Sequence, residues 1–179
     1  MDNLTCTSPF PMLLYLYPIF IEKGASFMAF HITTPEFSQT IQQALDTLHP
    51  NCDPEKPNLH LCPRLVSCDG PSLSVELEYD TKAWTSNPMG IVHGGVLALM
   101  LDNAMGLTCY CIYGHFTPTI SMNLTYARPV ALNETVRLRV TTLLAGGTTA
   151  QLQAQIYLPG QEERVLVSAS GVYCSRTRS

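Results

Sequence analysis

Two features between residues 87 and 102 have residue types that could carry out chemistry. The first is the pair Gly94-Gly95, which directly precedes a long apolar run. Glycines at a helix start let a ligand approach the backbone closely. The free N–H groups there lie at the positive end of the helix dipole. This position is therefore suited to an oxygen that gains negative charge during a reaction.

The second feature is Asp102, which interrupts the apolar run. A lone buried carboxylate is unfavourable unless it is paired or neutral. From its residue type and surroundings, Asp102 is either a structural hydrogen-bonding residue or a functional base, and the sequence favours neither.

The spacing between these two features has a consequence for assembly. Gly94 and Asp102 are eight residues apart, which corresponds to about 12 Å along a helix. One carbonyl cannot contact both groups, so a shared substrate requires that they come from different subunits. Two antiparallel copies of the helix would bring Gly94 of one chain near Asp102 of the other. The low content of charged residues, 13 %, also favours a homodimer with a buried interface.

The elements that must position these residues follow from hydrophobic periodicity. A first helix is predicted from Pro35, after Thr33-Thr34, to about His49. The run from Gly95 to Leu107 has no polar face, which predicts a helix buried on nearly all sides. Alternating residues predict two strands before this helix and an antiparallel meander of four strands after it, at residues 64–68, 73–80, 120–126, 136–140, 150–156 and 165–169. We expect an α+β fold, with one antiparallel β-sheet wrapped around a long central helix.

Composition argues against several classes of function. The net charge is −4 and no run of Lys or Arg occurs, so a nucleic-acid partner is not expected. The apolar stretch from Leu13 to Ile21 is broken by Pro18 and is too short to span a bilayer. No basic residue precedes it, so we expect neither a signal peptide nor a membrane anchor. The seven cysteines match no zinc spacing and are expected to be reduced thiols of a cytoplasmic protein.

The chain length of 179 residues suits a single domain. Met28 stands shortly before the first predicted helix, so residues 1–27 are interpreted as an over-extended start of translation or as a loosely packed N-terminal segment. Residues 28–179 then form the domain. The intact mass of the protein from its native host would distinguish the two interpretations of residues 1–27.

The run from Asn87 to Asp102 resembles the signature of hotdog-fold thioesterases, in the PaaI-like branch of the 4-hydroxybenzoyl-CoA thioesterase superfamily. The resemblance rests on the spacing from Asn87 to His93-Gly94-Gly95 and on to Asp102, and on the strand Thr119–Tyr126 followed by Arg128-Pro129. It covers most of the chain after the first helix. It implies a hotdog fold, hydrolysis of an acyl-CoA or a related thioester, and a homodimer or homotetramer with active sites at the subunit interface.

The resemblance implies a role for each residue of the motif. The Gly94 N–H would polarise the thioester carbonyl, and Gly95 would ease the start of the helix. Asp102 of the partner subunit would act as general base on water or as the nucleophile. Thioester hydrolysis needs only an oxyanion site and an activated water, so no metal and no cofactor is expected.

Four further residues have implied roles that compete with simpler explanations. Asn87 would place the water or the carbonyl, although it could only cap a turn. His93 would order the loop and assist the carbonyl, although it could only order the loop. Thr119 would orient water, although Thr is common in strands. Arg128 would bind a CoA phosphate, although it could be an ordinary surface arginine.

Three alternatives stay open at this point. The family often has a Gly-Arg pair for the nucleotide phosphates, but here Gly146-Gly147 is followed by Thr148. This departure leaves acyl carrier protein possible as the carrier in place of CoA. His93 keeps open a hotdog dehydratase or hydratase, which relies on a catalytic His with a carboxylate partner. A non-catalytic acyl-CoA-binding protein is the third possibility, but no output domain is visible.

Overall fold

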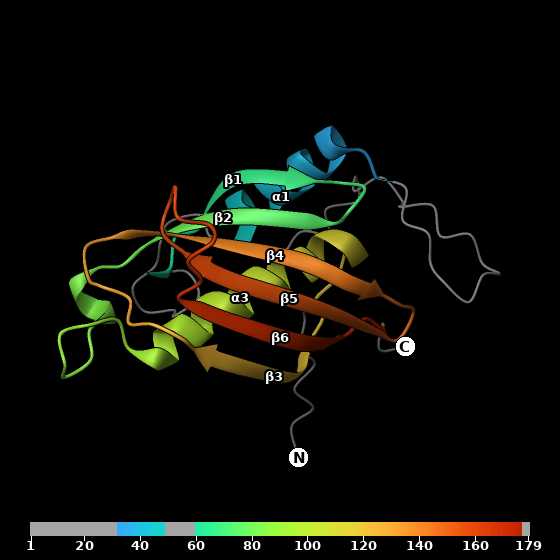
Figure 1. Cartoon of the computed structure of the whole chain (residues 1–179). Coiled ribbons are helices and arrows are strands. Elements are labelled where there is room, and N and C mark those ends of the chain that lie inside the picture. The colour runs from blue at the N-terminus through green and yellow to red at the C-terminus, as the bar shows by residue number, and fades with distance from the viewer. Residues whose placement is uncertain (1–31, 49–59, 177–179) are drawn as a thin grey trace, which may run out of the picture.

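The structure is a computed structural model, and it describes residues 32–48 and 60–176. Our interpretations of residues 1–27 lie outside the described residues. The described chain is an α+β fold with one six-stranded antiparallel sheet, a long central helix and a second helix that packs on the sheet edge (Figure 1).

The sheet has the strand order β1-β2-β4-β5-β6-β3. Its strands are β1 Arg64–Asp69, β2 Ser74–Asp80, β3 Thr119–Tyr126, β4 Thr135–Ala145, β5 Thr149–Tyr157 and β6 Val167–Cys174. The predicted antiparallel meander is confirmed for β4, β5 and β6. It is wrong for β3, which does not pair with the strand that follows it in sequence. Instead β3 lies at the far edge of the sheet and pairs with β6.

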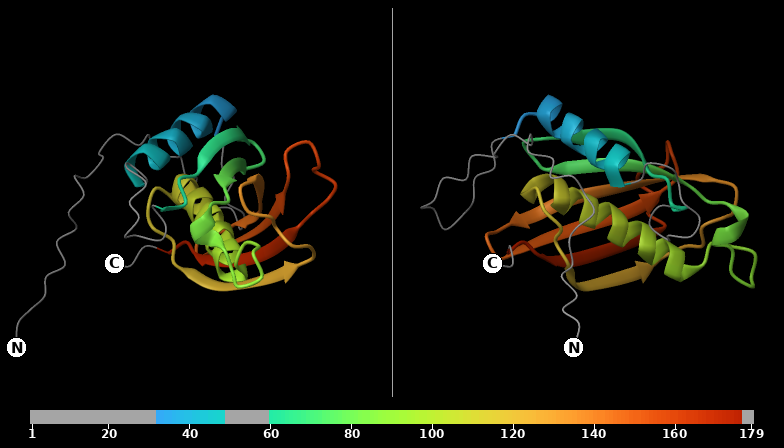
Figure 2. Two further views of the ribbon diagram at one scale, coloured as in Figure 1. Left: turned by 90° about the vertical axis from the view of Figure 1, so that its left-hand side faces the viewer. Right: turned by 180° about the vertical axis from the view of Figure 1, so that it is seen from behind.

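The central helix is α3, Gly94–Tyr113, and the curved sheet wraps around it (Figure 2). It ends because Gly114 adopts a left-handed conformation, with φ 70°, and donates its N–H to the Tyr110 carbonyl. By length and composition alone α3 could span a membrane. Here it is the core helix, and Leu97, Met100 and Leu101 are among its buried side chains.

The first helix is α1, Thr34–Leu48, as the sequence predicted. The Thr33 N–H and hydroxyl both donate to Glu36 Oε2, at 2.9 and 2.7 Å, which caps the helix start. Phe37, Ile41 and two further apolar residues are buried, and the helix packs against β1 and α3.

The expectation that α3 is buried on nearly all sides is wrong for one stripe of its surface. Asp102, Gly106, Tyr110 and Tyr113 recur at helical spacing and are only half-buried, and Gly95 is exposed. Asp102 is the only residue of this stripe with a charged side chain. A helix that is apolar all round but leaves one stripe uncovered has a surface suited to a partner or a ligand.

The cysteines depart from the expectation of seven reduced thiols. Cys62 forms a disulfide bond, whereas Cys68, Cys109, Cys111 and Cys174 are free thiols. Burial raises the pKa of the Cys109 thiol to about 12. This thiol therefore stays protonated at neutral pH and is a poor nucleophile.

Candidate active site

The start of α3 is held by His93. The His93 Nδ1 accepts a hydrogen bond from the Gly95 N–H at 2.9 Å, and the His93 N–H donates to the Thr85 carbonyl at 2.7 Å. The imidazole therefore caps the helix, and an Nδ1 that accepts belongs to the tautomer with its proton on Nε2. His93 is exposed, so Nε2 remains open to solvent or to a ligand.

Gly94 is the first residue of α3, and its N–H is an available donor. It has no hydrogen-bond acceptor among the residues that the structure describes, unlike the capped N–H of Gly95. The Gly94 carbonyl accepts from the Tyr126 hydroxyl at 3.0 Å, which ties the helix start to the end of β3. A free amide at the positive end of a helix is a ready donor for an oxyanion.

Asn87 organises the loop that leads to this amide. Its Oδ1 accepts from the N–H groups of Met89 and Ile91, at 2.9 and 3.3 Å. The turn-capping explanation therefore fits the oxygen of Asn87. Its side-chain NH₂ has no hydrogen-bond partner within residues 32–48 and 60–176 and remains available to a ligand.

Asp102 lies two turns further along α3, half-buried between the helix and the sheet edge. Its Oδ1 accepts two hydrogen bonds, from the Thr119 hydroxyl at 2.7 Å and the Tyr173 hydroxyl at 3.0 Å. No donor within the described ranges reaches Oδ2. The carboxylate is thus held through one oxygen while the other stays free to accept or transfer a proton.

A β-bulge in β3 gives Thr119 its direction. The register with β6 pairs Thr119 with Tyr173 and then Ser121 with Val172, so Ile120 is the extra residue. Strict alternation would place Thr119 on the opposite face from Met122 and Tyr126. The bulge shifts this parity, and the Thr119 hydroxyl therefore faces α3.

Tyr173 is a site residue that the sequence interpretation missed. Its side chain is fully buried, and a buried tyrosine hydroxyl needs a hydrogen-bond partner. Its spacing from Val167, Ala169 and Gly171 could have placed it on the inner face of β6. Nothing in the sequence indicated that its partner would be Asp102, because these residues are 71 positions apart.

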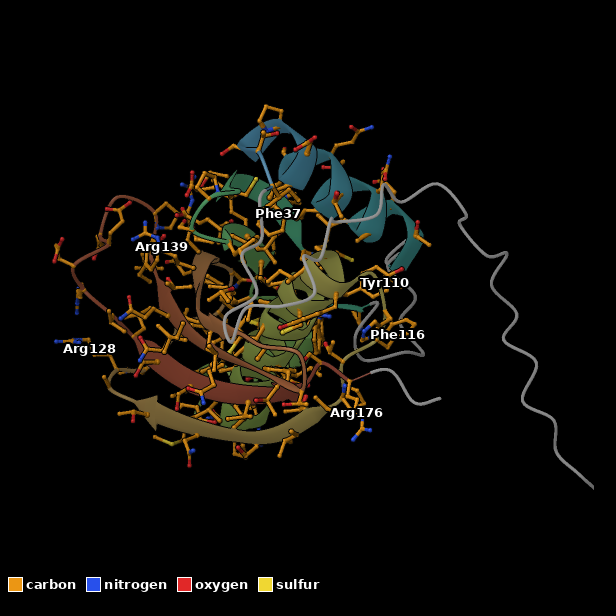
Figure 3. The ribbon with its side chains drawn as sticks, turned by 90° about the vertical axis from the view of Figure 1, so that its right-hand side faces the viewer. Phe37, Tyr110, Phe116, Arg128, Arg139 and Arg176 are labelled. Carbon is orange, nitrogen blue, oxygen red and sulfur yellow. The ribbon has the colours of Figure 1, made fainter. Side chains whose placement is uncertain are left out.

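Arg128 follows β3 and is exposed, with its guanidinium donating to the Val165 carbonyl at 2.7 Å. Its backbone N–H is bonded to the Leu166 carbonyl. In Figure 3 it lies on the opposite side of the molecule from Tyr110 and Phe116, which contact each other with ring centroids 5.2 Å apart. Arg128 therefore belongs to the end of β3 that contacts Gly94 through Tyr126.

The predicted site residues thus form two groups within one chain. Asn87, His93, Gly94 and Gly95 gather at the start of α3, with Arg128 toward the same end of β3. Asp102 and Thr119 form the second group, together with Tyr173. Because α3 is continuous from Gly94 to Tyr113, the Gly94 amide and the Asp102 carboxylate are separated by about 12 Å of helix. Within the described part of the chain, no three His, Cys, Asp or Glu side chains are grouped as a metal site.

Part of the sequence matches a known protein family. A sequence model of the thioesterase superfamily matches residues 89–165, a range that includes His93, Asp102 and Thr119. None of the curated proteins matches this chain significantly.

Three solved structures illustrate the likeness in fold. The PaaI protein of the E. coli phenylacetic acid degradation operon has a TM-score of 0.65 at 17 % identity, over 80 % of this chain and 97 % of its own. A phenylacetic acid degradation-related protein from Ralstonia eutropha JMP134 has a TM-score of 0.62 at 21 % identity, over 77 % and 98 %. A thioesterase protein from Streptococcus pneumoniae TIGR4, solved with coenzyme A, has a TM-score of 0.56 at 22 % identity, over 65 % and 91 %.

The expected hotdog fold is therefore confirmed, since the sheet wrapped around α3 is shared with these PaaI and thioesterase structures. The match from residue 89 to residue 165 contains the turn, the central helix and the strand that carry most of the motif. This chain therefore has the hotdog fold of the PaaI proteins, and residues 89–165 match the sequence model of the thioesterase superfamily.

Proposed function

We propose that this protein hydrolyses an acyl-CoA thioester to a free acid and a thiol. The observation that carries the proposal is a pair of complementary groups on α3, the Gly94 N–H and the Oδ2 of Asp102, neither of which has a hydrogen-bond partner among the described residues. The first is a donor for a carbonyl oxygen that gains charge, and the second is an acceptor for a proton. The match of residues 89–165 to the thioesterase superfamily model supports this chemistry.

The reaction follows from these two groups. Asp102 Oδ2 takes a proton from water as the water oxygen attacks the thioester carbon. The carbonyl oxygen becomes an oxyanion, which the Gly94 N–H stabilises at the positive end of α3. The tetrahedral intermediate then breaks its C–S bond, and the thiolate leaves and takes up a proton. In the alternative route Oδ2 itself attacks the thioester carbon, the C–S bond breaks and the thiolate leaves and takes up a proton. Water then hydrolyses the resulting anhydride, which releases the acid and restores the Asp102 carboxylate.

The site is completed by a second copy of the chain. One thioester carbonyl cannot contact both Gly94 and Asp102 of the same helix, which are separated by about 12 Å, so we place the partner's Asp102 opposite Gly94. The edge strand β3 supports a homodimer, because it pairs with β6 on one side only and exposes Ile120 and Tyr126 at 58 % and 52 %. The same motif is compatible with a dimer of dimers.

The remaining residues take supporting roles in this proposal. His93 and Asn87 hold the loop through their accepting atoms, and the Nε2 of His93 and the amide NH₂ of Asn87 are left for the carbonyl or the water. Gly95 closes the helix cap, and Thr119 donates to Asp102. Arg128 is the candidate for a CoA phosphate, and the CoA bound by the pneumococcal neighbour supports CoA as carrier. We place the reaction in the cytoplasm.

Within one chain, the hydrogen bonds of His93 fit hydrolysis better than dehydration or hydration. A hotdog dehydratase needs a catalytic His with a carboxylate partner. Here the Nδ1 of His93 accepts from the Gly95 N–H instead. No carboxylate among the described residues is hydrogen-bonded to His93.

The direct test is a panel of acyl-CoAs, with thiol release followed by a thiol reagent. We expect turnover by the wild-type protein and its loss in Asp102→Asn, by at least a hundredfold. Asp46→Asn is the matched control, because it makes the same change on α1, at a residue whose carboxylate accepts a hydrogen bond from Gln42. Full activity of Asp102→Asn would contradict the mechanism.

The same panel separates the competing functions and carriers. Loss of an enoyl-CoA substrate without release of free CoA would favour a hydratase, and binding without any turnover would favour a non-catalytic protein. Presenting one acyl group on CoA and on acyl carrier protein decides the carrier. Arg128→Ala should raise the KM for the CoA substrate but not for the acyl carrier protein substrate. The control is Arg64→Ala, which removes the ion pair with Asp80 at the opposite edge of the sheet and should leave both KM values unchanged.

A further inference from the structure

The Tyr173 ring lies between two glycines, which have no side chain that would occupy its space. A Cβ on Gly171 would lie 2.8 Å from one edge of the Tyr173 ring, and a Cβ on Gly106 would lie 3.9 Å from the other edge. Both glycines lie inside regular elements, where glycine is normally unfavourable. The ring is thus held between β6 and α3.

The Tyr173 hydroxyl meets the same carboxylate oxygen as Thr119. Thr119 and Tyr173 are directly opposite each other in the β3–β6 register, and both donate to Asp102 Oδ1. Two donors from neighbouring strands fix the orientation of the carboxylate. The position of Oδ2 then follows from the covalent geometry of the group.

We infer that Tyr173 is a positioning residue of the proposed thioesterase, which acts with Thr119 to hold Oδ1 of Asp102 so that Oδ2 faces the bound thioester. This inference rests on the proposed function, because it assigns Oδ2 as the reacting atom. A buried phenol that only needed a partner would not require the carboxylate of the reacting residue. Holding a reacting group in a productive orientation is a recognised contribution to rate.

The surroundings of Tyr173 keep it a donor. Burial raises the pKa of its phenol, and the nearby charge of Asp102 raises it further. The other titratable group that acts on this phenol is Cys109 of α3, whose thiol stays neutral because burial raises its pKa. The strand β3 has no charged side chain. The phenol therefore donates to Asp102 throughout the range of an ordinary assay.

The test compares kcat, KM and the pH dependence of kcat for the full-length wild type and Tyr173→Phe, with an acyl-CoA that the wild type hydrolyses. Removal of the hydroxyl should lower kcat about tenfold and leave KM nearly unchanged. The acid limb of the profile should move to higher pH, because the carboxylate loses a donor that favours its charged form.

The matched control is Tyr79→Phe. Tyr79 is also fully buried and donates to Asn103, the neighbour of Asp102 on α3, at 3.1 Å. Loss of its hydroxyl should lower stability without moving the acid limb. If Tyr173→Phe keeps the wild-type kcat and acid limb while Asp102→Asn is inactive, the positioning role is wrong. If Asp102→Asn is itself active, the proposed function fails instead.

A second variant protects the test against misfolding of Tyr173→Phe. Site-specific 3-fluorotyrosine at position 173 keeps the hydroxyl and makes it a stronger donor. The acid limb should then move to lower pH, opposite to the shift in Tyr173→Phe. An unchanged limb with this residue would also overturn the inference.

Discussion

At the scale of single residues, the proposed site depends on which polar atoms are engaged and which are free. The Gly94 N–H and the Asp102 Oδ2 have no partner among the described residues, whereas the neighbouring Gly95 N–H and Asp102 Oδ1 are bonded. At both positions a hydrogen bond holds one polar atom, and the adjacent polar atom stays available to a substrate. A sequence motif names the residue, but only the hydrogen bonds identify the atom.

Gly94→Ala should separate activity from stability. The atoms nearest to an added Cβ would belong to the Tyr126 side chain, at 3.5–3.6 Å, which is an ordinary contact distance. Thermal unfolding should therefore stay close to that of the wild type. The methyl group would obstruct the approach of a carbonyl to the amide, and kcat/KM should fall at least tenfold. An unchanged kcat/KM would show that no substrate oxygen docks at Gly94.

At the scale of elements, the edge strand β3 and its neighbour β6 build the surroundings of Asp102. The bulge at Ile120 directs Thr119 toward α3, and Tyr173 reaches the same carboxylate from the paired position. The packing of β6 against α3 determines whether a larger side chain can be accommodated beside Tyr173. A Cβ added to Gly171 on β6 would lie 2.8 Å from the Tyr173 ring, whereas a Cβ added to Gly106 on α3 would lie 3.9 Å from it.

We predict opposite effects for alanine at these two glycines. Gly171→Ala would place a Cβ 2.8 Å from a buried ring that has little room to move, so it should lower the free energy of unfolding by about 1–3 kcal/mol. Gly106→Ala meets only the far edge of that ring at 3.9 Å and should raise it by up to about 1 kcal/mol through helix propensity. Urea denaturation measures both. If Gly171→Ala were as stable as the wild type, the Tyr173 ring would have room to move away from the added Cβ.

At the scale of the whole molecule, the proposal requires two chains for each active site. The half-buried stripe of α3 and the single-sided pairing of β3 leave surface that a second copy would cover. The same arrangement would explain why so few residues are charged. A monomer of this fold would present each half of the site without the other.

Mixed dimers test this requirement directly. A Gly94→Ala chain and an Asp102→Asn chain, given different affinity tags and purified through both tags, would contain one site with both groups intact and one with neither. We expect about half of the wild-type activity from the mixed dimer, well above that of either variant alone, because a two-fold dimer has two equivalent sites. Mixed dimers that are no more active than the two variants alone would mean that Gly94 and Asp102 act within one chain.

Much of the fold could be predicted from the sequence, because its signals are local. The alternation in residues 150–156 and the capping residues Thr33 and Glu36 depend on neighbours a few positions away. The predicted helix from Gly95 to Leu107 became α3, Gly94–Tyr113, with its end set by Gly114. The motif from Asn87 to Asp102 likewise lies within one turn and one helix, so the spacing of its groups was fixed by the sequence.

Only the tertiary structure decided where distant segments meet. The sequence predicted a meander, but β3 crosses the sheet to pair with β6, and the bulge at Ile120 reverses the direction that alternation gives to Thr119. The contact between Asp102 and Tyr173 joins positions 71 residues apart. Such a contact depends on strand order and on how the strands pack against the helix. These are set by the burial of the whole core, which no short stretch of sequence determines.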